Sequence, residues 1–598
     1  MAPSVGLALA LFPAGSRAET GDPGEAAIGV DSAAIRYNQL GYLPAGPKVA
    51  IWCGRTGPLP GTFRIEDSAG AIVWGPGPVD PAGPFGPCEV AARLDFSAFD
   101  VPGRYRVAAG SRTTPWFSIE PDIYDGTADF LLRYLRQQRS RWNPLFRDSV
   151  HHRTDGILVD HPRTGEYIDV AGGWADAADY LQYVTTSAHA TFSLLLSFRD
   201  HPSAFDDAYD AAGLPGPNGT PDVLDEARWG LEWLLRMYPR DDLMLNQLGD
   251  DRDHAFLDLP TTDSSDYGWG RGGYRPVYPC TGRPQGLLRH RNRSDGKAST
   301  AGKMASAFAL GAQVFAARDP EFADSLAARA EAAYRVGRAN PGACQTAPAG
   351  APYFYEEANW VDDMELAAAE LHALTGRARY LVEALEYAAR EPVTPWMGAD
   401  TARHYEWYPW HNNGHYEIWR RAEGPARDTM VAYYRRGLEA VAGRASNAFR
   451  IGVPFIWCSN NLVASFATQA ALFRTMTGDS TFVAHEQAAV DWLFGTNPWG
   501  TSMVIGLPTD GDYPEDPHSV VATALGTRTQ YGGLVDGPVY RSIFENLLGI
   551  ELYEPDEYAV WNTGRVVYHD DWGDYSTNEP IMDGTANLVY VLAMLGGT

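Results

Sequence analysis

The distribution of hydrophobic residues divides the chain into a β-rich part and an α-rich part. Between residues 34 and 122, short runs of β-branched and aromatic residues alternate with turns that contain Gly and Pro. Strands at this spacing predict a β-sandwich of immunoglobulin type. This part contains no cluster of titratable residues, so we expect it to support the fold rather than to carry chemistry.

From residue 123 onward, the hydrophobic period changes to that of helices. Apolar residues recur at i, i+3 and i+4, as on the buried face of an amphipathic helix. In one segment, Leu462, Phe466 and Phe473 form a stripe, and Gly478 stands where a C-terminal cap belongs. The predicted helices span residues 123–140, 176–198, 221–238, 301–317, 321–338, 362–375, 378–390, 427–443, 459–476, 480–494 and 580–595.

The loops between alternate helices are long and rich in Gly, Trp, His and Asp. A helical scaffold with such loops at one end is a suitable place for a groove. About a dozen helices suggest nested hairpins closed into an (α/α)6 toroid or barrel, although an open solenoid would have the same helix count. We therefore expect a multidomain β + α protein, with a β-sandwich at 34–122 and a helical catalytic domain at 123–598.

One stretch combines a forced turn with two acidic residues. In DVAGGWADAADYLQYV (169–184), Gly172 and Gly173 allow backbone angles that other residues avoid. A helix is predicted to begin near Asp176, which would place Asp176 and Asp179 on one face at its N-terminus. Helix capping alone would explain both acids. The alternative is a pair of functional carboxylates behind a Gly-Gly-Trp turn.

A second acidic stretch, DYSTNEPIMD, lies near the end of the sequence. Pro580 fits the first position of the last predicted helix, which would leave Glu579 at a loop tip beside the helix N-terminus. The helix dipole would lower the pKa of Glu579. A proton donor at this position needs burial or nearby carboxylates to raise the pKa. The acids that could supply this effect are Asp570, Asp571, Asp574 and Asp583.

An acid that donates a proton and a carboxylate that activates water are the minimum for cleaving a glycosidic bond. Two further regions could bind a sugar. Residues 496–519 offer Trp499 for stacking and His518 for hydrogen bonding, although a lone His is usually structural. The segment YEWYPWHNNGH (405–415) is so dense in aromatic, His and Asn residues that we interpret it as a binding surface rather than as core.

Composition narrows the choice of partner. The chain has 598 residues and a net charge of −27, which argues against nucleic acid and anionic membranes because both require a basic patch. No run of about eighteen apolar residues is present, so no transmembrane helix is predicted. The 18 Trp and 31 Tyr side chains offer flat apolar faces with a polar edge, which suit sugars, although most are expected in the core.

The N-terminal segment and the cysteines are informative about the cellular compartment of the protein. Residues 1–33 are predicted to be a signal or disordered segment, because an apolar run, VGLALALF, precedes a Ser-Arg-Ala cleavage pattern. No Lys or Arg precedes that run, but a secreted or periplasmic protein is expected. Five Cys residues are an odd number. Cys53 could pair with Cys88, and Cys280 with Cys344, while five buried thiols are an equally good interpretation.

Taken in order, these stretches resemble glycoside hydrolase family 9, a cellulase family with a toroid of six helix hairpins. GGWADAADY is similar to the family's G-G-W-x-D-A-G-D, GTNPWG with PHS to its N-P-x-G and P-H, and NEPIMD to its N-E-x-x-x-D. IRYNQLGYLPAGPKVA and FDVPGRYRV resemble the immunoglobulin-like module that precedes many bacterial members. The resemblance covers nearly the whole chain.

The resemblance implies an inverting hydrolase of β-1,4-glucans. Asp179 would be the general base that takes a proton from the attacking water, Asp176 would help hold that water, and Glu579 would be the general acid. An inverting enzyme holds its two carboxyl groups roughly 6.5–9.5 Å apart. The residues that we expect to bind sugar are His518, Trp410, His411, His415, Trp499, Tyr575 and Trp174.

Some positions depart from the family pattern. Ala178 replaces a Gly of the first motif. Some members carry a Cys/His zinc site in the first helical loop, and here Ser140, His151 and His152 stand near such positions without any Cys, so we predict that this structural zinc site is lost. No cofactor is required. Calcium could bind an acidic loop such as 510–512, but a solvated loop is the preferred interpretation.

We favour an endo-acting cellulase that cleaves cellulose-like β-glucans. The alternative is an exo-acting relative that releases glucose, cellobiose or glucosamine from the ends of oligosaccharides. An acidic site would favour an amino sugar, yet the charge could be spread over the whole surface. A glucan-binding protein without catalysis is disfavoured, because all three carboxylates of the resemblance are present.

Overall fold

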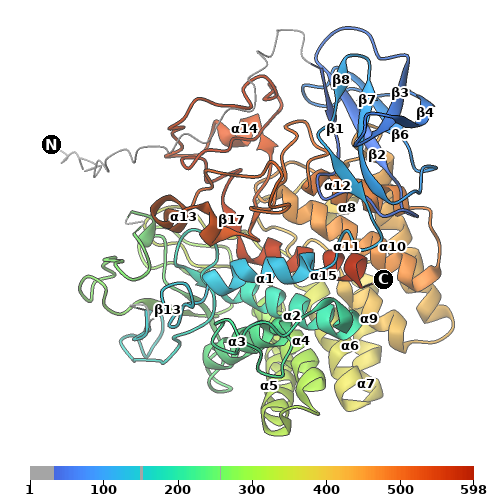
Figure 1. The fold of residues 1–598 in the computed structure, drawn as a ribbon. Coiled ribbons are helices and arrows are strands. Elements are labelled where there is room, and N and C mark those ends of the chain that lie inside the picture. Colours follow the sequence, from blue (N-terminus) through green and yellow to red (C-terminus); the bar gives the residue numbers. More distant parts are fainter. Residues whose placement is uncertain (1–32, 148–151, 256–257, 598) are drawn as a thin grey trace.

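The computed structural model describes residues 33–147, 152–255 and 258–597. Residues 1–32 of the predicted signal segment, and His151, lie outside the described residues. A β-sandwich sits against one side of a larger helical body (Figure 1). Within the described ranges, no helix is both long and apolar enough to cross a membrane.

Two sheets make up the sandwich, and each run predicted as a strand contributes to one of them. The first sheet has the order β1-β2-β6-β5, and the second has the order β4-β3-β7-β8 with β9 also paired to β7. All of these pairs are antiparallel. The strands are β1 (Ala33–Arg36), β2 (Val49–Gly54), β3 (Thr62–Asp67), β4 (Ile72–Pro78), β5 (Asp80–Ala82), β6 (Val90–Asp95), β7 (Gly103–Ala109), β8 (Arg112–Thr113) and β9 (Phe117–Ile119).

Strand β2 is buried on both of its faces. Val49, Ile51 and Cys53 pack into the core of the helical body, whereas Ala50 and Trp52 pack into the core of the sandwich. Successive side chains of a strand point to opposite faces, so one sheet serves two cores. This double burial explains why the run around β2 is continuously apolar instead of alternating with polar residues.

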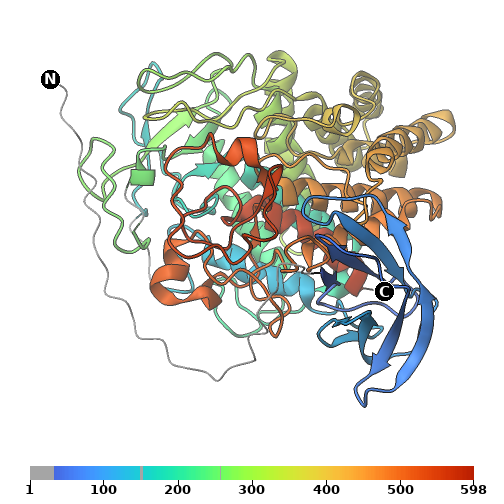
Figure 2. The ribbon, with the colours of Figure 1, turned by 90° about the horizontal axis from the view of Figure 1, so that it is seen from above.

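Polar contacts also fix the sandwich on the helical body. The side-chain amide of Asn38 donates to Asp491 Oδ1 at 2.8 Å and to the hydroxyl of Tyr124 at 3.2 Å. The guanidinium of Arg93 donates to the carbonyl oxygen of Ala448 at 2.6 Å. Figure 2 shows the sandwich covering the outside of the helices at this side. The sandwich is therefore a packed part of the molecule.

Both predicted cysteine pairs are disulfides. Cys53 is bonded to Cys88 within the sandwich, and Cys280 is bonded to Cys344 in the helical body. Cys458 is buried and free. The five thiols are therefore not all reduced, and each bridge restricts the unfolded chain.

Every segment predicted as helical contains a helix in the structure. One further helix, α9, was not predicted; it begins at Asn413, near the end of the segment 405–415, and its nine residues are too few for a clear periodic signal. The long helices are α1 (Thr127–Gln137), α2 (Val184–Asp200), α3 (Asp222–Met237), α4 (Ala298–Phe315), α5 (Pro320–Ala339), α6 (Val361–Thr375), α7 (Ala378–Arg390), α9 (Asn413–Arg421), α10 (Pro425–Arg444), α11 (Ser459–Thr477), α12 (Val483–Leu493) and α15 (Met582–Gly596).

The helix contacts form a circuit. Helix α2 packs against α4, α4 against α6, α6 against α9, α9 against α11, α11 against α15, and α15 against α2. Each of these six also packs against a second helix, namely α3, α5, α7, α10, α12 and α1 in the same order. Helices α2, α4, α11 and α15 are buried around most of their circumference, as expected for helices enclosed by others.

Two predicted helix starts are wrong. Helix α2 begins at Val184, eight positions after Asp176, because the residues before it form strand β11 (Gln182–Tyr183), which pairs with β12 (Leu245–Leu248). The N-cap of α2 has no side-chain cap bond, so neither acid caps it. Pro580 lies in strand β17 (Pro580–Ile581), paired with β14 (Leu534–Val535), rather than at the first position of α15.

The Asn38–Asp491 contact predicts a measurable loss of stability. Asn38→Ala leaves the buried carboxyl of Asp491 without one of its donors, which costs about 1–3 kcal/mol of unfolding free energy. Chemical denaturation of both proteins measures this loss. Ser111→Ala in an exposed hairpin turn is the control and should change the free energy of unfolding by less than about 0.5 kcal/mol. Equal stabilities of Asn38→Ala and the unchanged protein would contradict the prediction.

Candidate active site

The loop before α2 is held in place by tryptophans of α3. The indole of Trp233 donates to the carbonyl oxygen of Val170 at 3.0 Å, and that of Trp229 donates to Gly173 at 2.8 Å. Gly173 has φ +73°, and a Cβ at this position would lie 2.6 Å from the ring of Trp233. The predicted Gly-Gly turn is therefore required both by backbone angle and by close packing.

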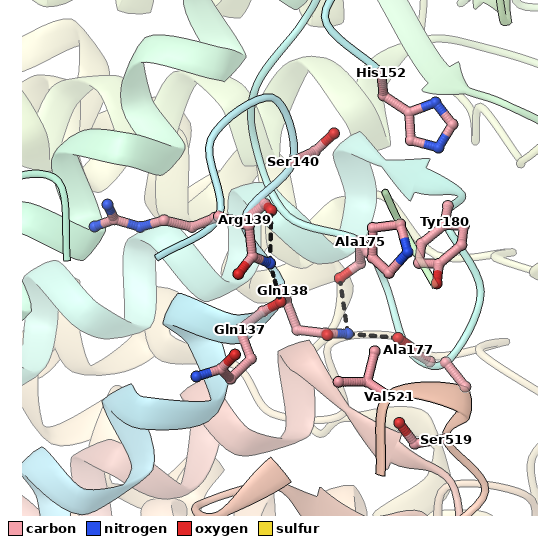
Figure 3. A pocket seen from close by; sticks show the side chains of 13 residues that line it. Gln137, Gln138, Arg139, Ser140, His152, Ala175, Ala177, Tyr180, Ser519 and Val521 are labelled. Atoms are coloured by element: carbon pink, nitrogen blue, oxygen red, sulfur yellow. Dashed lines mark hydrogen bonds between the residues drawn. The ribbon is translucent and has the colours of Figure 1, made fainter. Parts of the chain in front are cut away.

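The other side of the loop rests on the segment that follows α1 (Figure 3). The side-chain amide of Gln138 donates to the carbonyl oxygens of Ala175 and Ala177. Its main-chain carbonyl accepts from the N–H of Ala175 at 2.8 Å. A cavity of about 30 Å³ remains behind the loop, lined in part by Ser140 and His152. The loop is thus fixed by hydrogen bonds from α3 and from the residue that follows α1.

Asp179 projects from this loop into the site. Its Oδ1 accepts the N–H of Leu181 at 3.1 Å, and its Oδ2 lies 2.9 Å from Nε2 of His254. The side chain is 16 % exposed. Burial opposes a charge on His254, but the hydrogen bond to Asp179 and the charge of Asp253 raise the pKa of His254 to about 10. An imidazolium therefore faces this carboxylate.

Glu579 reaches the same loop from the other end of the chain. Its Oε1 accepts the N–H of Ala178, the neighbour of Asp179, at 3.0 Å. Burial and the charges of Asp536 and Asp179 raise the pKa of Glu579 well above its usual value, against the opposing effects of the Ala178 N–H and His254. This carboxyl group therefore keeps its proton to a higher pH than an ordinary Glu does.

Asp176 lies deeper than Asp179. It is 3 % exposed, and its two carboxylate oxygens accept from the hydroxyls of Thr186 and Tyr355. Burial and the charges of Asp583 and Asp179 raise its pKa well above the usual value. The carbonyl oxygen of Asp176 also accepts the N–H of Met582 at 3.0 Å, a second link between the two acidic stretches.

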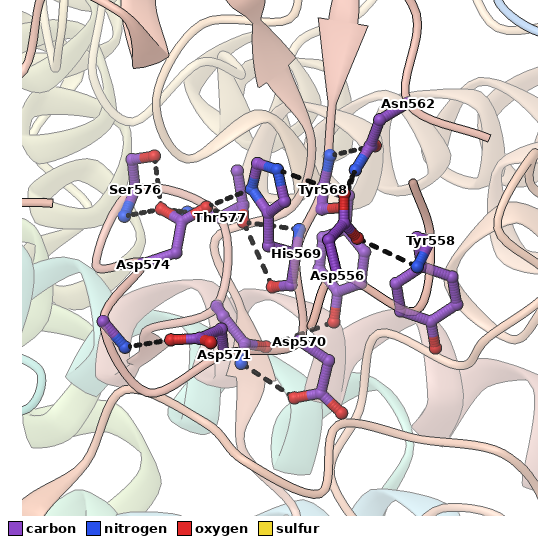
Figure 4. Close-up of polar contacts among 12 residues, drawn as sticks. Asp556, Tyr558, Asn562, Tyr568, His569, Asp570, Asp571, Asp574, Ser576 and Thr577 are labelled. Atoms are coloured by element: carbon purple, nitrogen blue, oxygen red, sulfur yellow. Dashed lines mark hydrogen bonds and ion pairs between the residues drawn. The ribbon is translucent and has the colours of Figure 1, made fainter. Parts of the chain in front are cut away.

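The other acids of the C-terminal stretch have a structural function (Figure 4). Asp574 accepts from the hydroxyl of Thr577 at 2.8 Å and lies 2.7 Å from Nδ1 of His569. Asp570 and Asp571 accept main-chain N–H groups of neighbouring loops. We predicted that these acids would raise the pKa of Glu579. The main charges that do so belong to Asp536 and Asp179, because Asp574 is bonded within its own loop.

Several aromatic side chains lie close to these acids, and Tyr353, Tyr355, His404 and Trp457 among them were not singled out from the sequence. Tyr355 stacks on Tyr405 with ring centroids 3.8 Å apart, and His404 stacks on Trp457 at 4.4 Å. Trp457 also packs against Tyr575, a predicted sugar-binding residue, at 5.4 Å. Predicted His518 lies 6.0 Å from the Tyr575 ring and donates from Nδ1 to the carbonyl oxygen of Trp572. We name Tyr353, Tyr355, His404, Tyr405, Trp457 and Tyr575 the aromatic wall.

Five predicted sugar-binding residues lie in the core, and we correct their assignment to packing. Trp410 and Trp174 are fully buried, and Trp499, His411 and His415 are almost so. The segment that we interpreted as a binding surface folds into the interior, where Trp410 packs against tyrosines and His415 bonds to a buried Glu. The high aromatic content of this segment therefore reflects packing in the core. Local composition does not determine whether a loop faces the solvent or the interior.

The missed residue with the most direct contact is His254. It lies after α3 and β12 in the short 3-10 helix η2 (Asp253–Ala255), which contains no recognised motif, and only the tertiary contact with Asp179 marks it. The sequence signal was limited to a His among acidic residues. A cavity of about 370 Å³ adjoins the segment before His518 and was also not foreseen. It is lined by Glu515, Asp516, Pro517, Ala522, Thr523, Thr527, Tyr553, Glu554, Asp571 and Trp572.

The predicted metal positions have other contacts. Nε2 of His152 lies 3.3 Å from Oδ2 of Asp263, and the N–H of Ser140 donates to the carbonyl oxygen of Gly173. Among the described residues, no group of three or more His, Cys, Asp or Glu side chains could hold a metal ion. The loss of the structural zinc site and the solvated loop at 510–512 stay predictions.

Comparisons with known proteins match both parts of the chain to sequence families. The sequence model of glycosyl hydrolase family 9 matches residues 124–592, and that of the cellulase N-terminal ig-like domain matches residues 31–114. The N-terminal sheets are thus an immunoglobulin-like domain, followed by the helical domain. The motifs singled out in the sequence therefore identified the family correctly.

Two curated relatives are each about a quarter identical to the chain over the residues that align. Endoglucanase C of Cellulomonas fimi is 28 % identical over 511 residues, which cover 79 % of this chain but 44 % of that protein. The chain thus matches less than half the length of this relative. The xyloglucan-specific endo-beta-1,4-glucanase BoGH9A of Bacteroides ovatus is 24 % identical over 84 % of this chain and 86 % of its own length.

Two solved structures are similar over nearly their whole length. A metagenome-derived glycoside hydrolase family 9 endoglucanase is 28 % identical, with a TM-score of 0.73 over 95 % of this chain and 99 % of that one. The family 9 endoglucanase J30 is 25 % identical, with a TM-score of 0.72 over 93 % and 99 %.

The packing of Gly173 predicts a steric effect on the site. Gly173→Ala forces its new Cβ against the Trp233 ring and displaces the loop that carries Asp179, so we expect kcat/KM to fall at least roughly tenfold. Gly70→Ala is the matched control, because Gly70 also has positive φ (+80°) but nothing within 4 Å of the added Cβ. It should keep the activity. Similar activities of the two variants, measured per folded protein, would contradict the prediction.

Proposed function

Since the chain belongs to glycosyl hydrolase family 9, we propose that this glycoside hydrolase is an inverting endo-β-1,4-glucanase acting on cellulose-like β-glucans. The observation that carries the proposal is the hydrogen bond from the Ala178 N–H to Glu579, which brings a protonated carboxyl next to the loop of Asp179. The circuit of helix contacts supports the finer assignment of the helical domain as an (α/α)6 toroid.

In this mechanism the two carboxyl groups have opposite tasks. Glu579 gives its proton to the glycosidic oxygen as the bond to the anomeric carbon breaks. Asp179 takes a proton from the water that attacks the same carbon from the opposite face. The product sugar leaves with inverted configuration, Glu579 is left ionised and Asp179 protonated, and exchange with solvent restores both. The raised pKa of Glu579 supports the donor role.

His254 and Asp176 support this division of work. The His254 imidazolium and the Leu181 N–H each occupy one oxygen of Asp179, which fixes the plane of the carboxylate and leaves further lone pairs for water. Asp176 is enclosed by Thr186 and Tyr355 and holds the neighbouring loop through Met582. We infer that Asp176 orients the water through its loop position, as the resemblance implies.

Substrate class and compartment follow from the relatives and the surface of the site. The named relatives are endoglucanases, one of them specific for xyloglucan. In the aromatic wall, the rings of Tyr353, His404, Trp457 and Tyr575 are partly exposed. Tyr575 and His518 stay candidates for sugar contact. Two disulfides support export, because such bonds persist in oxidising compartments.

The assignment of acid and base predicts different responses to an activated leaving group. Glu579→Gln should lower kcat on β-glucan by about 10²–10⁴-fold. The same variant should hydrolyse a dinitrophenyl β-cellobioside at most of the rate of the unchanged enzyme, because this leaving group needs no proton. Asp179→Asn should lower both rates, since water activation is needed for either substrate. Initial rates on the two substrates test this.

Asp510→Asn on an exposed loop is the matched control and should leave both rates unchanged. The assignment would be contradicted if Glu579→Gln lost its activity on both substrates. It would also be contradicted if Asp179→Asn recovered its rate on the activated substrate.

Endo action predicts a specific product distribution. Soluble β-glucan should yield oligosaccharides of intermediate length early in the reaction, with a rapid fall in viscosity, because an open groove binds internal segments of a chain. Products are followed by chromatography over time, with chitosan oligomers as the second substrate. Glucose or cellobiose as the sole early product, or glucosamine from chitosan, would instead establish the exo-acting alternative.

A further inference from the structure

The cavity of about 370 Å³ beside the segment 515–517 contains none of the groups that the proposed mechanism uses. Its volume lies within the range of about 300–1,000 Å³ that is typical of small-molecule sites. Its lining comes from three separate segments, 515–527, 553–554 and 571–572. Among the described residues that line it, none belongs to the aromatic wall and none is a proposed catalytic carboxyl group. We name it the acidic cavity.

The acidic cavity carries charges of one sign. Four of its ten lining residues are acidic, and none of the ten is a Lys, Arg or His. Two of these acids, Glu515 and Glu554, are exposed, and within the described part of the chain neither forms an ion pair. A cleft lined by charges of one sign concentrates ligands of the opposite sign. The cavity therefore favours a cation and disfavours a phosphate or carboxylate ligand.

Hydrogen bonds fix the main chain that carries both exposed acids. Asp570 Oδ2 accepts the N–H of Glu515 at 2.7 Å. Asp571 Oδ2 accepts the N–H groups of Tyr553 and Glu554, each at 2.8 Å. Two edges of the cavity are thus held by two consecutive residues of one segment. A preformed site loses less conformational entropy when a ligand binds.

Two aromatic rings line the cavity together with these carboxylates. The ring centroids of Tyr553 and Trp572 lie 5.3 Å apart, and Tyr553 is 51 % exposed. An aromatic ring offers an apolar face to a sugar ring, and the same face attracts an ammonium group. The hydroxyls of Thr523 and Thr527 also line the cavity and can accept hydrogen bonds. This lining suits a hydroxylated ring that carries a positive charge.

The cation that fits this lining is an organic one. Among the described residues, no group of three or more His, Cys, Asp or Glu side chains could hold a metal ion. Both oxygens of Asp571 are already engaged by main-chain N–H groups. The exposed carboxylates of Glu515 and Glu554 are the ones that an ammonium group on a larger body can reach.

We propose that the acidic cavity binds amino sugars, with the ammonium group of a glucosamine unit at the carboxylates of Glu515 and Glu554 and its ring against Tyr553. An ammonium group donates three hydrogen bonds, and those that it gives to carboxylates are charge-assisted. The proposal concerns binding at a second place and adds no bond cleavage. It therefore goes beyond the proposed function and does not depend on the roles of Glu579 and Asp179.

Titration calorimetry with two trisaccharides tests the proposal. A fully deacetylated chitosan trimer and cellotriose have the same ring and linkage, but only the first carries ammonium groups. Both are titrated into Glu579→Gln, so that neither is cleaved, in a mildly acidic buffer that keeps the amino groups protonated.

The cavity variant adds Glu515→Gln and Glu554→Gln to this protein. We expect it to bind the chitosan trimer more weakly by roughly fivefold or more, because two charge-assisted contacts are lost. Its affinity for cellotriose should not change. Added salt should weaken the binding of the chitosan trimer, because ions screen the same contacts. Tyr553→Ala should also weaken it, because the ring face is lost.

Glu423→Gln combined with Glu439→Gln is the matched control, since both residues are exposed, carry the same charge and do not line the cavity. This pair should leave the affinity for the chitosan trimer unchanged. The proposal would be overturned if the chitosan trimer did not bind, if the cavity variant lost both trisaccharides equally or kept both, or if the control pair caused the same loss. Failure of the proposed function is a separate result. It would appear as β-glucan hydrolysis retained by Glu579→Gln, and it would not change the difference between the cavity variant and its control.

Discussion

The contact between the Ala178 N–H and the carboxyl of Glu579 is the interaction on which the site depends. It joins two loops that are about 400 residues apart in the sequence. A second main-chain bond, from Met582 to the carbonyl of Asp176, lies beside it. Helix α2 follows one loop and α15 the other, and these helices pack together. The candidate active site thus lies where the last helix of the circuit, α15, packs against the first, α2.

The surroundings then give each carboxyl group its own chemistry. Asp179 faces an imidazolium, Asp176 is enclosed by two hydroxyls, and Glu579 is half-buried near other negative charges. The charge state of a carboxyl depends on burial, on neighbouring charges and on hydrogen-bond donors. These three acids have different combinations of the same factors. An acid and a base can therefore exist close together at one pH.

The immunoglobulin-like domain contributes to this site without entering it. Its first sheet gives one face to the sandwich and the other to the helical body, so the two cores share β2. The Asn38–Asp491 contact provides a buried polar bond at the same boundary. Because the boundary is continuous core rather than a linker, removing the domain would expose apolar surface of the helical body. The domain is part of the scaffold that holds the helices.

The sequence by itself predicted most of the strands and helices and singled out three carboxylates. The periods of 2 and 3.6 predicted the strands and long helices, and the GGWADAADY and NEPIMD motifs located Asp176, Asp179 and Glu579. Only the tertiary structure decided which residues are buried and which distant residues are in contact. In the structure, the aromatic segment around Trp410 lies in the core, and α2 begins at Val184. His254 contacts Asp179, and the main chain of Asp536 contacts that of Glu579. The physical reason is that burial and charge depend on contacts between residues far apart in the chain, whereas hydrophobic period depends on neighbours.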